Sequence, residues 1–522
     1  MVRTTWRSIV AGALLIALLA ACGGPGAAPA VGPDPAPQAA DEPVTLTIAV
    51  HQDIQHWDPH NHNYTFTEAV HQNVFDYLVR MDPETGEFAP DLATSWRLVE
   101  PTVWEFQLRE NVKFHNGLPF TAEDVKFTVE RVAFDTSLKE QRTMATVKEV
   151  QIVDSHTVRI VTHEPDPVLL NRLSRIGSGI MSKAHWEAVG GLEGWQKDPV
   201  GTGPFKFESW VKDESITLVA FDEHWRGRPQ IDKVVFRVIP EVATRVAELQ
   251  SGGVDIALRI GVDNAQTVSA DPGLTTASGL TNRVWLLMVR TQRDYVTGNP
   301  LVREAIELAV DRNALISVAE PGLGVPTRTR NTPGITGADP SLYNQDLYNP
   351  ARAKELLAEA GYPDGGVPIG LLARSGGTDA IIAQALAGML EEVGFQVNLE
   401  MLDATAFTNR LNAATTPEIY LNAFGNSMKD AEIAYTFLTT AIDIERIGYA
   451  PQDLVDLYQA TKSEMDAARR AEMFSQIARR VADDRPQIAL FQSGEVHGIR
   501  KGIEWKPTRD EMLWVYDIRV TR

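Results

Sequence analysis

Four histidines lie within twelve residues: His51, His56, His60 and His62. Neutral imidazoles are good ligands for nickel, copper and zinc, so this group could hold a metal or a metal-bearing compound. The spacing lacks an i, i+4 pair on a helix that would direct two rings to one ion. His56, His60 and His62 are therefore metal candidates only for an alternative function, in which the chain binds nickel, a metallophore or haem. No resident metal or cofactor is expected.

Catalytic motifs are missing from the sequence. It has no GxSxG nucleophile elbow, no HExxH pair, no phosphate-binding loop and no cysteine placed as a nucleophile. An extracellular peptidase would need a nucleophile with a nearby base, and no pattern supplies that pair. These residues predict a protein that binds its ligand rather than an enzyme that transforms it.

Cys22 is the only cysteine, so the chain cannot form an internal disulfide. It follows Arg3, Arg7 and the apolar run Ile9–Ala21, which has the length of a signal-peptide core and is too short to span a bilayer. The ending LLAAC at Leu18–Cys22 resembles a bacterial lipobox. This resemblance implies that residues 1–21 are removed and that Cys22 carries a lipid anchor. The Gly-, Pro- and Ala-rich residues 22–43 then form a tether.

The size and charge of the chain further limit the class of protein to which it can belong. A chain of 522 residues exceeds what one hydrophobic core usually supports, so at least two lobes are expected. The formal charge of −20 repels phosphate backbones and anionic membrane faces. The composition therefore predicts a soluble globular protein that does not bind nucleic acid.

Strand and helix signals alternate along the chain. Val44–Val50 alternates as a strand, and Trp104, Phe106 and Leu108 predict a second. Helices are predicted after Thr121, with Asp124 three residues on, after Asn299-Pro300, and after Asn349-Pro350, where Gly361 supplies the stop. A strand from Phe395 to Met401 follows a helix that ends near Val393. This alternation predicts an α/β fold.

A series of longer motifs then occurs in a fixed order. WDPH at Trp57–His60 is followed by NVFDYLVR, APDLATSWRL, FHNG and FTAEDVKFTVERV, the last ending at Val132. PVGTGPF begins at Pro199, FDEHW at Phe221, AVDRNALI at Ala309 and YNPARAKELLAEAGYPDG at Tyr348. The series resembles the family 5 extracellular solute-binding proteins, which serve dipeptide, oligopeptide, nickel and glutathione ABC importers. The similarity covers roughly residues 44–520.

This resemblance implies a two-lobe periplasmic-binding-protein-like fold with two crossing hinge segments. Residues 44–75, 200–280 and 488–522 would form the lobe I core, residues 76–199 an extra subdomain of lobe I, and residues 283–487 lobe II. It implies a monomer outside the cytoplasm, bound to the membrane only through its lipid anchor. Its partners would be a small, peptide-like solute and the transmembrane subunits of an ABC permease. A ligand sensor without a permease is an alternative on the same fold.

The same resemblance points to ligand contacts. Tyr64 follows the DPH turn, in a stretch that the family brings to the cleft. Arg374 stands where dipeptide-binding relatives carry an arginine that pairs with a carboxylate. In the loop Phe424–Ile433, Asp430 corresponds to the aspartate that pairs with a peptide's ammonium group, and Phe424, Asn426 and Ser427 accompany it. The family's tryptophan and Asp-Pro are absent there, and Lys429 could neutralise Asp430.

Trp285 lies at the expected crossing into lobe II, with a role either in the core or in the pocket. If Arg374 and Asp430 are contacts, replacing either with alanine should abolish a ligand-induced thermal shift and leave the melting point of the unliganded protein nearly unchanged. The sequence does not identify the ligand.

Overall fold

The structure of the chain is a computed structural model that describes residues 43–521. The predicted signal peptide, Cys22 and the predicted tether up to residue 42 lie outside these residues. The predicted helix starts are present: the Asn299 side chain accepts a hydrogen bond from the Leu301 N–H at 3.0 Å, and Asn349 accepts one from Arg352 at 3.1 Å. Both helices place proline in the first turn, where its missing N–H is not needed.

One large mixed sheet forms the frame of the molecule, and neighbouring strands in it are far apart in sequence. β1 is parallel to β10 and β11, and β14 is parallel to β15 and β16. In sheet order the strands are β15 (Phe395–Leu402), β14 (Val367–Arg374), β16 (Ile419–Phe424), β12 (Leu274–Val289), β17 (Gln487–Arg500), β11 (Ile256–Ala257), β1 (Thr45–Val50), β10 (Lys233–Val238), β9 (Ser215–Ala220) and β8 (Phe205–Val211), with β13 (Val325–Pro326) beside β17. The mixed sheet with its helices confirms the predicted α/β class.

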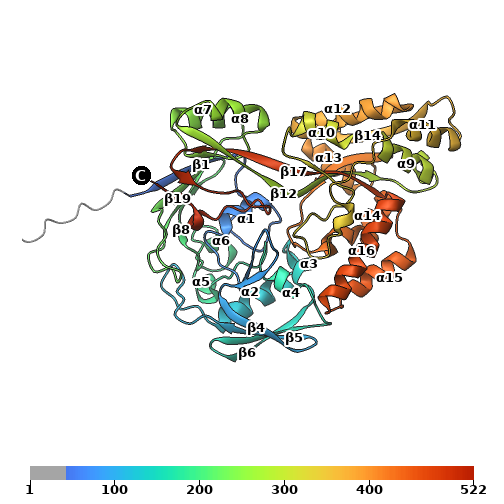
Figure 1. The fold of residues 1–522 in the computed structure, drawn as a ribbon. Coiled ribbons are helices and arrows are strands. Elements are labelled where there is room, and N and C mark those ends of the chain that lie inside the picture. Colours follow the sequence, from blue (N-terminus) through green and yellow to red (C-terminus); the bar gives the residue numbers. More distant parts are fainter. Residues whose placement is uncertain (1–42, 522) are drawn as a thin grey trace, which may run out of the picture. The chain divides into compact units, whose positions relative to one another are not determined.

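β12 and β17 run antiparallel to each other and connect the two ends of this sheet (Figure 1). The first half of β12 and the second half of β17 lie on the side of β11, whereas the second half of β12 pairs with β16. The ladder is irregular between Leu280 and Val284, and there the Gln492 amide donates to the Thr281 carbonyl at 2.6 Å. An irregular ladder at a crossing is where two packed bodies can bend relative to each other.

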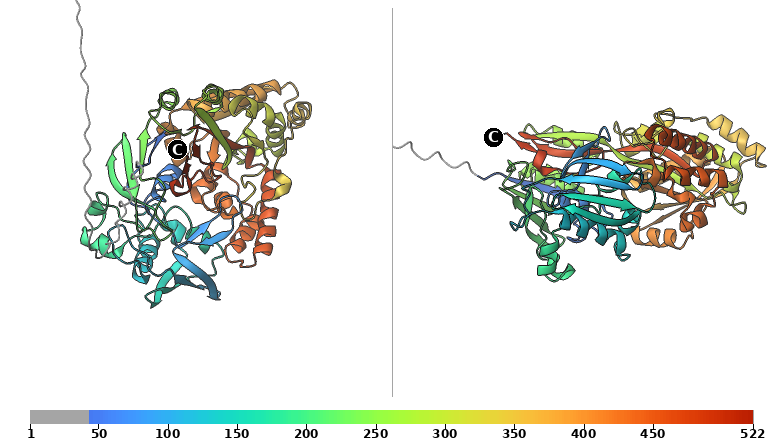
Figure 2. Two further views of the ribbon diagram at one scale, coloured as in Figure 1. Left: turned by 60° about the vertical axis from the view of Figure 1, so that its left-hand side comes forward. Right: turned by 90° about the horizontal axis from the view of Figure 1, so that it is seen from below.

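We use lobe I for residues 44–280 and 494–521 and lobe II for residues 284–491. Figure 2 shows lobe I in blue and green and lobe II in yellow and orange at opposite ends. Ile488, Leu490 and Phe491 pack in the core of lobe II. The predicted boundaries, including the one at residue 488 and the extra subdomain at residues 76–199, stay proposals.

Lobe I combines its share of the large sheet with smaller sheets and mostly short helices. A four-stranded antiparallel sheet packs against α2 (Ala122–Phe134). At the N-cap of this helix, the Thr121 N–H donates to the Asp124 carboxylate at 2.9 Å. The strands of the sheet are β4 (Ala93–Glu100), β5 (Val103–Leu108), β7 (Thr157–Thr162) and β6 (Val147–Asp154). The two-stranded sheets are β2 (Val79–Met81) with β3 (Phe88–Pro90) and β18 (Ile503–Glu504) with β19 (Arg519–Val520). The helices are α1 (Thr65–His71), α2 (Ala122–Phe134), α3 (Gln141–Met144), α4 (Leu169–Arg172), α5 (Lys183–Ala188), α6 (Leu192–Trp195), α7 (Val242–Ser251), α8 (Val262–Ser269) and the 3-10 turn η4 (Val515–Asp517).

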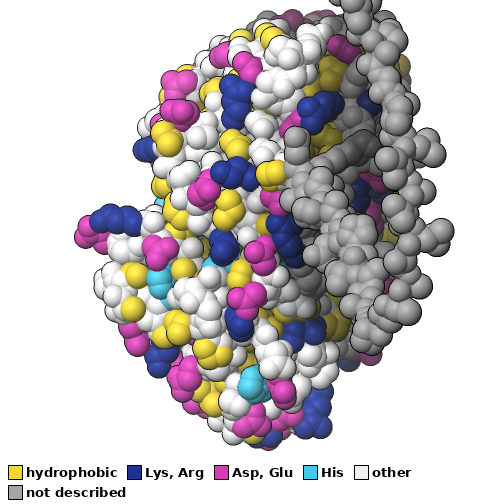
Figure 3. All heavy atoms as spheres, turned by 90° about the vertical axis from the view of Figure 1, so that its left-hand side faces the viewer, with side chains coloured by type: hydrophobic (Ala, Val, Ile, Leu, Met, Phe, Trp, Pro, Cys, Tyr) yellow, Lys and Arg dark blue, Asp and Glu magenta, His cyan; other side chains and the backbone are white. Residues whose placement is uncertain are grey.

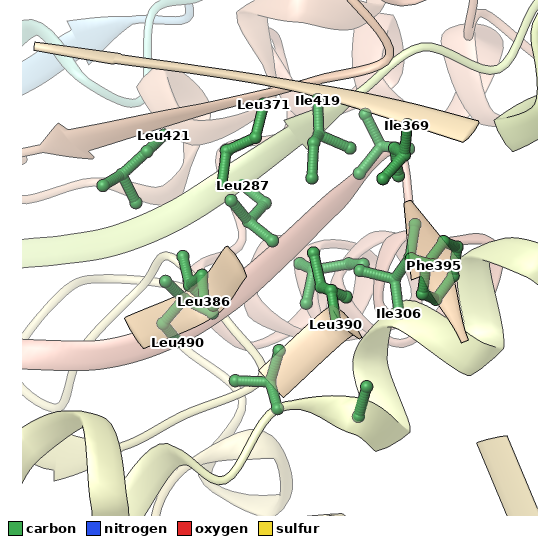
Figure 4. Packing of buried hydrophobic residues seen from close by; sticks show 14 of the residues in the cluster. Leu287, Ile306, Ile369, Leu371, Leu386, Leu390, Phe395, Ile419, Leu421 and Leu490 are labelled. Carbon is green, nitrogen blue, oxygen red and sulfur yellow. The ribbon is translucent and has the colours of Figure 1, made fainter. Parts of the chain in front are cut away.

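Lobe II packs its helices around β12, β14 and β16. Figure 4 shows part of this core, where Leu287 and Leu421 of the sheet lie near Leu386 and Leu390 of α12. Removing one such buried leucine side chain typically costs about 2–5 kcal/mol, which makes this lobe a rigid support for the site. Its helices are α9 (Pro300–Ala309), α10 (Arg312–Ala319), α11 (Pro350–Glu359), α12 (Gly377–Glu392), α13 (Ala404–Asn412), α14 (Ala441–Ile447), α15 (Gln452–Thr461) and α16 (Ala467–Asp484), with the 3-10 segments η1 (Val296–Gly298), η2 (Pro340–Leu342) and η3 (Ala431–Leu438).

The surface carries both signs of charge. On the face shown in Figure 3, acidic, basic and hydrophobic side chains are interspersed. Among residues 43–521, no helix combines the length and apolar character needed to cross a bilayer.

Candidate functional site

A cavity of about 760 Å³ is lined by residues of both lobes and of the C-terminal segment. This volume suits a small organic ligand. Lobe I contributes Tyr64, Arg80 and Arg175, and lobe II contributes Arg374 and the residues around it. The C-terminal segment, which returns to lobe I after β17, adds residues 509–512 and Trp514. A ligand held here would therefore touch both lobes.

Arg374, predicted as a carboxylate partner, lies at the end of β14 and lines the cavity. Its Nη1 donates to the Asn422 side chain at 2.9 Å and to Asp379 at 3.3 Å, and its guanidinium carbon lies 4.2 Å from the Phe407 ring centre. Its Nε and Nη2 have no hydrogen-bond partner among the residues that the structure describes. The ring and Asn422 fix the guanidinium, so its free N–H groups are positioned to receive a carboxylate.

Tyr64 and Trp285 also line the cavity. Tyr64 is the N-cap residue of α1, and its side chain is 47% exposed. Trp285 also belongs to the lobe II core, where its indole N–H donates to Glu320 at 3.1 Å. Tyr64 thus presents a half-exposed aromatic surface, whereas Trp285 presents a buried one.

Asn426 and Ser427 lie in the loop after β16 and line the cavity. The Ser427 hydroxyl accepts a hydrogen bond from Arg175 Nη2 at 3.1 Å, and the next carbonyl, that of Met428, accepts one from Asn171 at 2.9 Å. Arg175 and Asn171 belong to lobe I, so this loop joins the two lobes at the cavity. Asn426 is buried and donates to the Asp430 carbonyl at 2.9 Å.

Asp430 lies outside the cavity lining, in contrast to the role expected for it. Its carboxylate forms a two-pronged ion pair with Arg470 of α16, at 2.5 and 2.7 Å, and both side chains are buried. Lys429 does not neutralise it, because the Lys429 ammonium pairs with Asp510 at 2.7 Å. A carboxylate committed to a buried arginine is not available to a ligand ammonium group.

Phe424, the last residue of β16, is also outside the lining. Its ring is covered by the Arg330 guanidinium, whose carbon lies 4.2 Å from the ring centre. Burial lowers the pKa of Arg330 to about 10. Phe424 therefore supports the loop from within lobe II.

Most of the charged lining was not predicted from sequence. The guanidinium carbon of Arg80, on β2, lies 3.5 Å from the Trp514 ring centre, and burial lowers the pKa of Arg80. The Arg80 side chain has no hydrogen bond or ion pair among the residues described. Arg175, Arg259, Arg283 and Arg509 complete the arginines, and Glu511 lies between two of them. Arg80 belongs to the NVFDYLVR motif, and its position after an apolar run was the available signal. The other charged residues of the lining are distant in sequence and come together only in the folded protein.

Basic groups outnumber acidic groups in this lining. The basic side chains are Arg80, Arg175, Arg259, Arg283, Arg374, Lys429 and Arg509, and the carboxyl groups are Glu68, Asp379, Asp510 and Glu511. Each carboxyl group already has a partner: Asp379 pairs with Arg374, Asp510 with Lys429, and Glu511 with Arg259 and Arg283. Glu68 accepts a hydrogen bond from Tyr77, and burial raises its pKa. The positive excess is local, since the whole chain carries −20.

The three histidines considered as metal ligands do not form one group. His60 Nε2 bonds the Gly179 carbonyl at 2.9 Å and its Nδ1 contacts Arg131 at 2.6 Å, next to the Asp58–Arg131 ion pair. His56 uses both ring nitrogens within its own loop. His62 instead lies beside Glu68 and His71, two residues that the sequence did not single out. Burial lowers the pKa of His60 and His62 to about 3, so both rings are neutral at pH 7.

Comparison with known proteins gives the family. The model described as bacterial extracellular solute-binding proteins, family 5 Middle, matches residues 87–443. The chain belongs to this family. This confirms the resemblance seen in the ordered motifs. Family 5 proteins bind solutes for transport, and extracytoplasmic location is part of that role.

Similar proteins share both sequence and fold. The glutathione-binding protein GsiB of Salmonella paratyphi A is 29% identical over 363 residues, which are 69% of this chain and 70% of that protein. The ABC transporter substrate-binding protein CtaP of Listeria monocytogenes has a TM-score of 0.82 at 22% identity, covering 92% of this chain and 100% of the other. DppA of Helicobacter pylori, in complex with the peptide STSA, has a TM-score of 0.78 at 24% identity, covering 92% and 98%. These likenesses confirm the predicted two-lobe binding-protein fold.

Proposed function

We propose that this family 5 protein captures a small, peptide-like solute carrying more carboxylates than ammonium groups and delivers it to an ABC permease. The observation that carries the proposal is the state of the charges around the cavity. Arg80 and Arg374 keep unused N–H donors, while every carboxyl group of the described lining already has a partner. The cavity can thus offer cations to a ligand, and it would have to break an existing pair to offer an anion.

The two arginines come from different lobes. Arg80 lies on β2 of lobe I and Arg374 on β14 of lobe II. A ligand with a carboxylate near each would bind the closed arrangement better than an open one, and so would shift the population toward closure. The permease would then recognise the closed protein. No step in this cycle makes or breaks a covalent bond of the solute.

The relatives support a peptide-like solute of this charge. GsiB is named for glutathione, which carries two carboxylates and one ammonium group, and the DppA structure contains a four-residue peptide. In this chain Asp430 is paired with Arg470 instead of facing the cavity. That pairing favours a ligand whose recognition relies on carboxylates and not on an α-ammonium group.

A charge series tests the proposal. Glutathione, trialanine and trilysine would be titrated into the protein and followed by thermal shift and calorimetry. We expect affinity to fall in that order. A hydrogen bond to a charged group contributes about 1.5–3 kcal/mol, so Arg80→Gln and Arg374→Gln should each weaken binding of the anionic peptide about ten- to a hundredfold. Equal affinity across the series would contradict the proposal.

Two matched variants control for general effects of removing an arginine. Arg109 covers Trp225 at 4.1 Å, much as Arg80 covers Trp514, but it lies outside the lining. Arg410 pairs with Glu400 at 2.8 Å and is likewise outside. Arg109→Gln and Arg410→Gln should therefore leave the affinity unchanged.

We also propose that lipid on Cys22 holds the protein at the outer face of the cytoplasmic membrane as a monomer. Two or three acyl chains are enough for stable anchoring, whereas one chain is marginal. Cys22→Ser should move the protein from the membrane fraction to the soluble fraction. Mass spectrometry of the wild-type N-terminal peptide should show the acyl groups. Retention of the serine variant in the membrane would contradict the anchor.

A further inference from the structure

His62, Glu68 and His71 form a buried group where the loop before α1 folds back on that helix. Their potential ligand atoms all lie within 4.8 Å of one another, and all three side chains are almost fully buried. His62 Nε2 is 3.3 Å from Glu68 Oε2. The rings of His62 and His71 meet edge to face with their centres 4.8 Å apart. Three side chains with metal-binding atoms thus converge away from bulk water.

Apart from His71 Nε2, the histidine ring nitrogens of this group lack hydrogen-bond partners, although His62 Nε2 lies close to the Glu68 carboxylate. His71 Nε2 bonds the His56 carbonyl at 2.9 Å, so Nε2 carries the proton and Nδ1 keeps a free lone pair. His71 Nδ1 and both ring nitrogens of His62 are buried with no hydrogen-bond partner among the residues described. Leaving a buried polar atom unpaired costs about 1–3 kcal/mol, so such atoms call for an explanation in terms of a ligand, an ion or a water molecule.

Neighbouring residues hold the side chains of His71 and Glu68 in fixed orientations, as neighbours of metal ligands commonly do. The His56 carbonyl fixes the His71 tautomer, and the Tyr77 hydroxyl donates to Glu68 Oε1, which leaves Oε2 directed at His62. His71 is further held by stacking on Trp57, with ring centres 5.2 Å apart. A carbonyl that accepts from a ligand histidine and a hydroxyl that donates to a ligand carboxylate are typical supports of metal sites.

We infer that His62, Glu68 and His71 bind a divalent transition-metal ion of the zinc class. Two imidazole nitrogens and one carboxylate oxygen suit Zn²⁺, Co²⁺ or Ni²⁺. Ligand bonds of about 2.1 Å in a tetrahedron place ligand atoms roughly 3.4 Å apart, so the ligand atoms, which lie within 4.8 Å of one another here, would move closer together around the ion. Tetrahedral coordination by three side chains leaves a fourth position for water or another group.

The site adjoins the solute cavity. Glu68 belongs to the cavity lining, whereas His62 and His71 lie behind it. Asn63 and Tyr64, between His62 and α1, also line the cavity. A metal ion would therefore tie the loop that carries Tyr64 to the helix that follows it, and the cavity gives the ion a path of entry. This role concerns the protein's own residues and does not depend on the identity of the solute.

The test uses the full-length protein, stripped with a chelator and titrated with Co²⁺ and then Zn²⁺. We expect one equivalent of Co²⁺ to bind with the visible absorption of a tetrahedral or five-coordinate ion, and Zn²⁺ to displace it. His62→Gln and His71→Gln should each lower the affinity more than a hundredfold. Glu68→Gln, which keeps the shape and the acceptor for Tyr77, should lower it at least tenfold and covers the case of a histidine variant that misfolds.

His224 provides the matched control. It is buried and both of its ring nitrogens lack partners, but among the residues described its carboxylate neighbour Asp76 is 3.7 Å away and no second histidine joins them. His224→Gln should leave Co²⁺ affinity and spectrum unchanged. The inference is overturned if the stripped protein shows no saturable Co²⁺ binding, if Glu68→Gln and His71→Gln bind as tightly as wild type, or if His224→Gln loses as much affinity as His71→Gln.

Discussion

Two regions of lobe II each place an arginine guanidinium beside a carboxylate, but only one of the two arginines is fully paired. At Asp430 and Arg470 the carboxylate and guanidinium are buried and satisfy each other at 2.5 and 2.7 Å. At Arg374 the guanidinium contacts Asn422 and Asp379 with one nitrogen only and keeps its other donors at the cavity. A closed pair contributes to the folded state, whereas a guanidinium with spare donors can contribute to binding. Sequence shows the residue types in both regions but not which of them are already paired.

The largest effect should follow from breaking the closed pair. Asp430→Ala leaves Arg470 charged and buried without its partner, and such a loss typically costs about 3–5 kcal/mol. Urea unfolding should show this decrease in the free energy of unfolding. The structure thus reverses the expectation that Asp430→Ala would leave the unliganded protein nearly unaffected.

Two further variants sharpen that prediction. Asp430→Ala combined with Arg470→Met removes both charges and should recover part of the lost stability. Glu193→Ala breaks the exposed Glu193–Lys197 pair and should produce no measurable change, because surface pairs contribute little. If Asp430→Ala were as stable as wild type but failed to bind the solute, the assignment of Asp430 to the interior would be wrong.

Lowering the pH should affect the stability of the protein interior but not the affinity of the cavity for its ligand. Burial lowers the pKa of His497 to about 3 and of His115 to about 4, against about 6.5 in the unfolded chain. Below pH 6.5 the unfolded state therefore takes up more protons than the folded state, and the free energy of unfolding decreases as the pH falls. Each of these two histidines should lower the free energy of unfolding by about 2 kcal/mol between pH 7 and pH 5.

The binding constant should behave differently over the same range. Arg80 and Arg374 stay charged, and the carboxylates of a peptide remain largely ionised at pH 5. Calorimetry at pH 7 and pH 5 should give similar affinities for the anionic peptide, while urea unfolding shows the loss of stability. The variant His497→Gln should flatten the stability curve. If the affinity decreased together with the stability, the cavity arginines would not bind the ligand independently of the buried titratable groups.

The smallest effect is expected at Tyr64. Its half-exposed ring lines the cavity, and an aromatic contact contributes about 0.5–1.5 kcal/mol, so Tyr64→Ala should weaken binding about two- to tenfold. Tyr348 has a similar exposure of 42% but lies outside the lining, so Tyr348→Ala should have no effect on calorimetric affinity. Equal losses in both variants would show that Tyr64 acts only through general surface effects.

Local sequence predicted the elements well. The capped helix starts at Thr121, Asn299 and Asn349 and the strands near Val44 and Phe395 were predictable because their signals lie within a few residues. The boundaries of the lobes stay predictions, because a crossing depends on which hydrophobic core each strand residue enters.

The site was harder to predict than the fold. Tyr64, Arg374, Asn426 and Ser427 line the cavity as the family resemblance suggested. Asp430 does not, because its partner Arg470 lies forty residues later on another helix. Arg80 meets Trp514 only after the C-terminal segment has returned to lobe I, and no local pattern encodes that contact. His71 was overlooked for the same reason: its proximity to His62 requires the loop to fold back on α1.

We propose that arginines of both lobes hold a solute rich in carboxylates and leave it chemically unchanged. Native mass spectrometry can identify this solute: the protein would be incubated with a small-molecule extract, desalted, and its retained ligand released and identified. We predict an intact compound with more carboxylates than ammonium groups, which is lost from the double variant Arg80→Gln/Arg374→Gln. A neutral or cationic ligand, a ligand retained by the double variant, or a cleaved product would show that the arginines do not have this role.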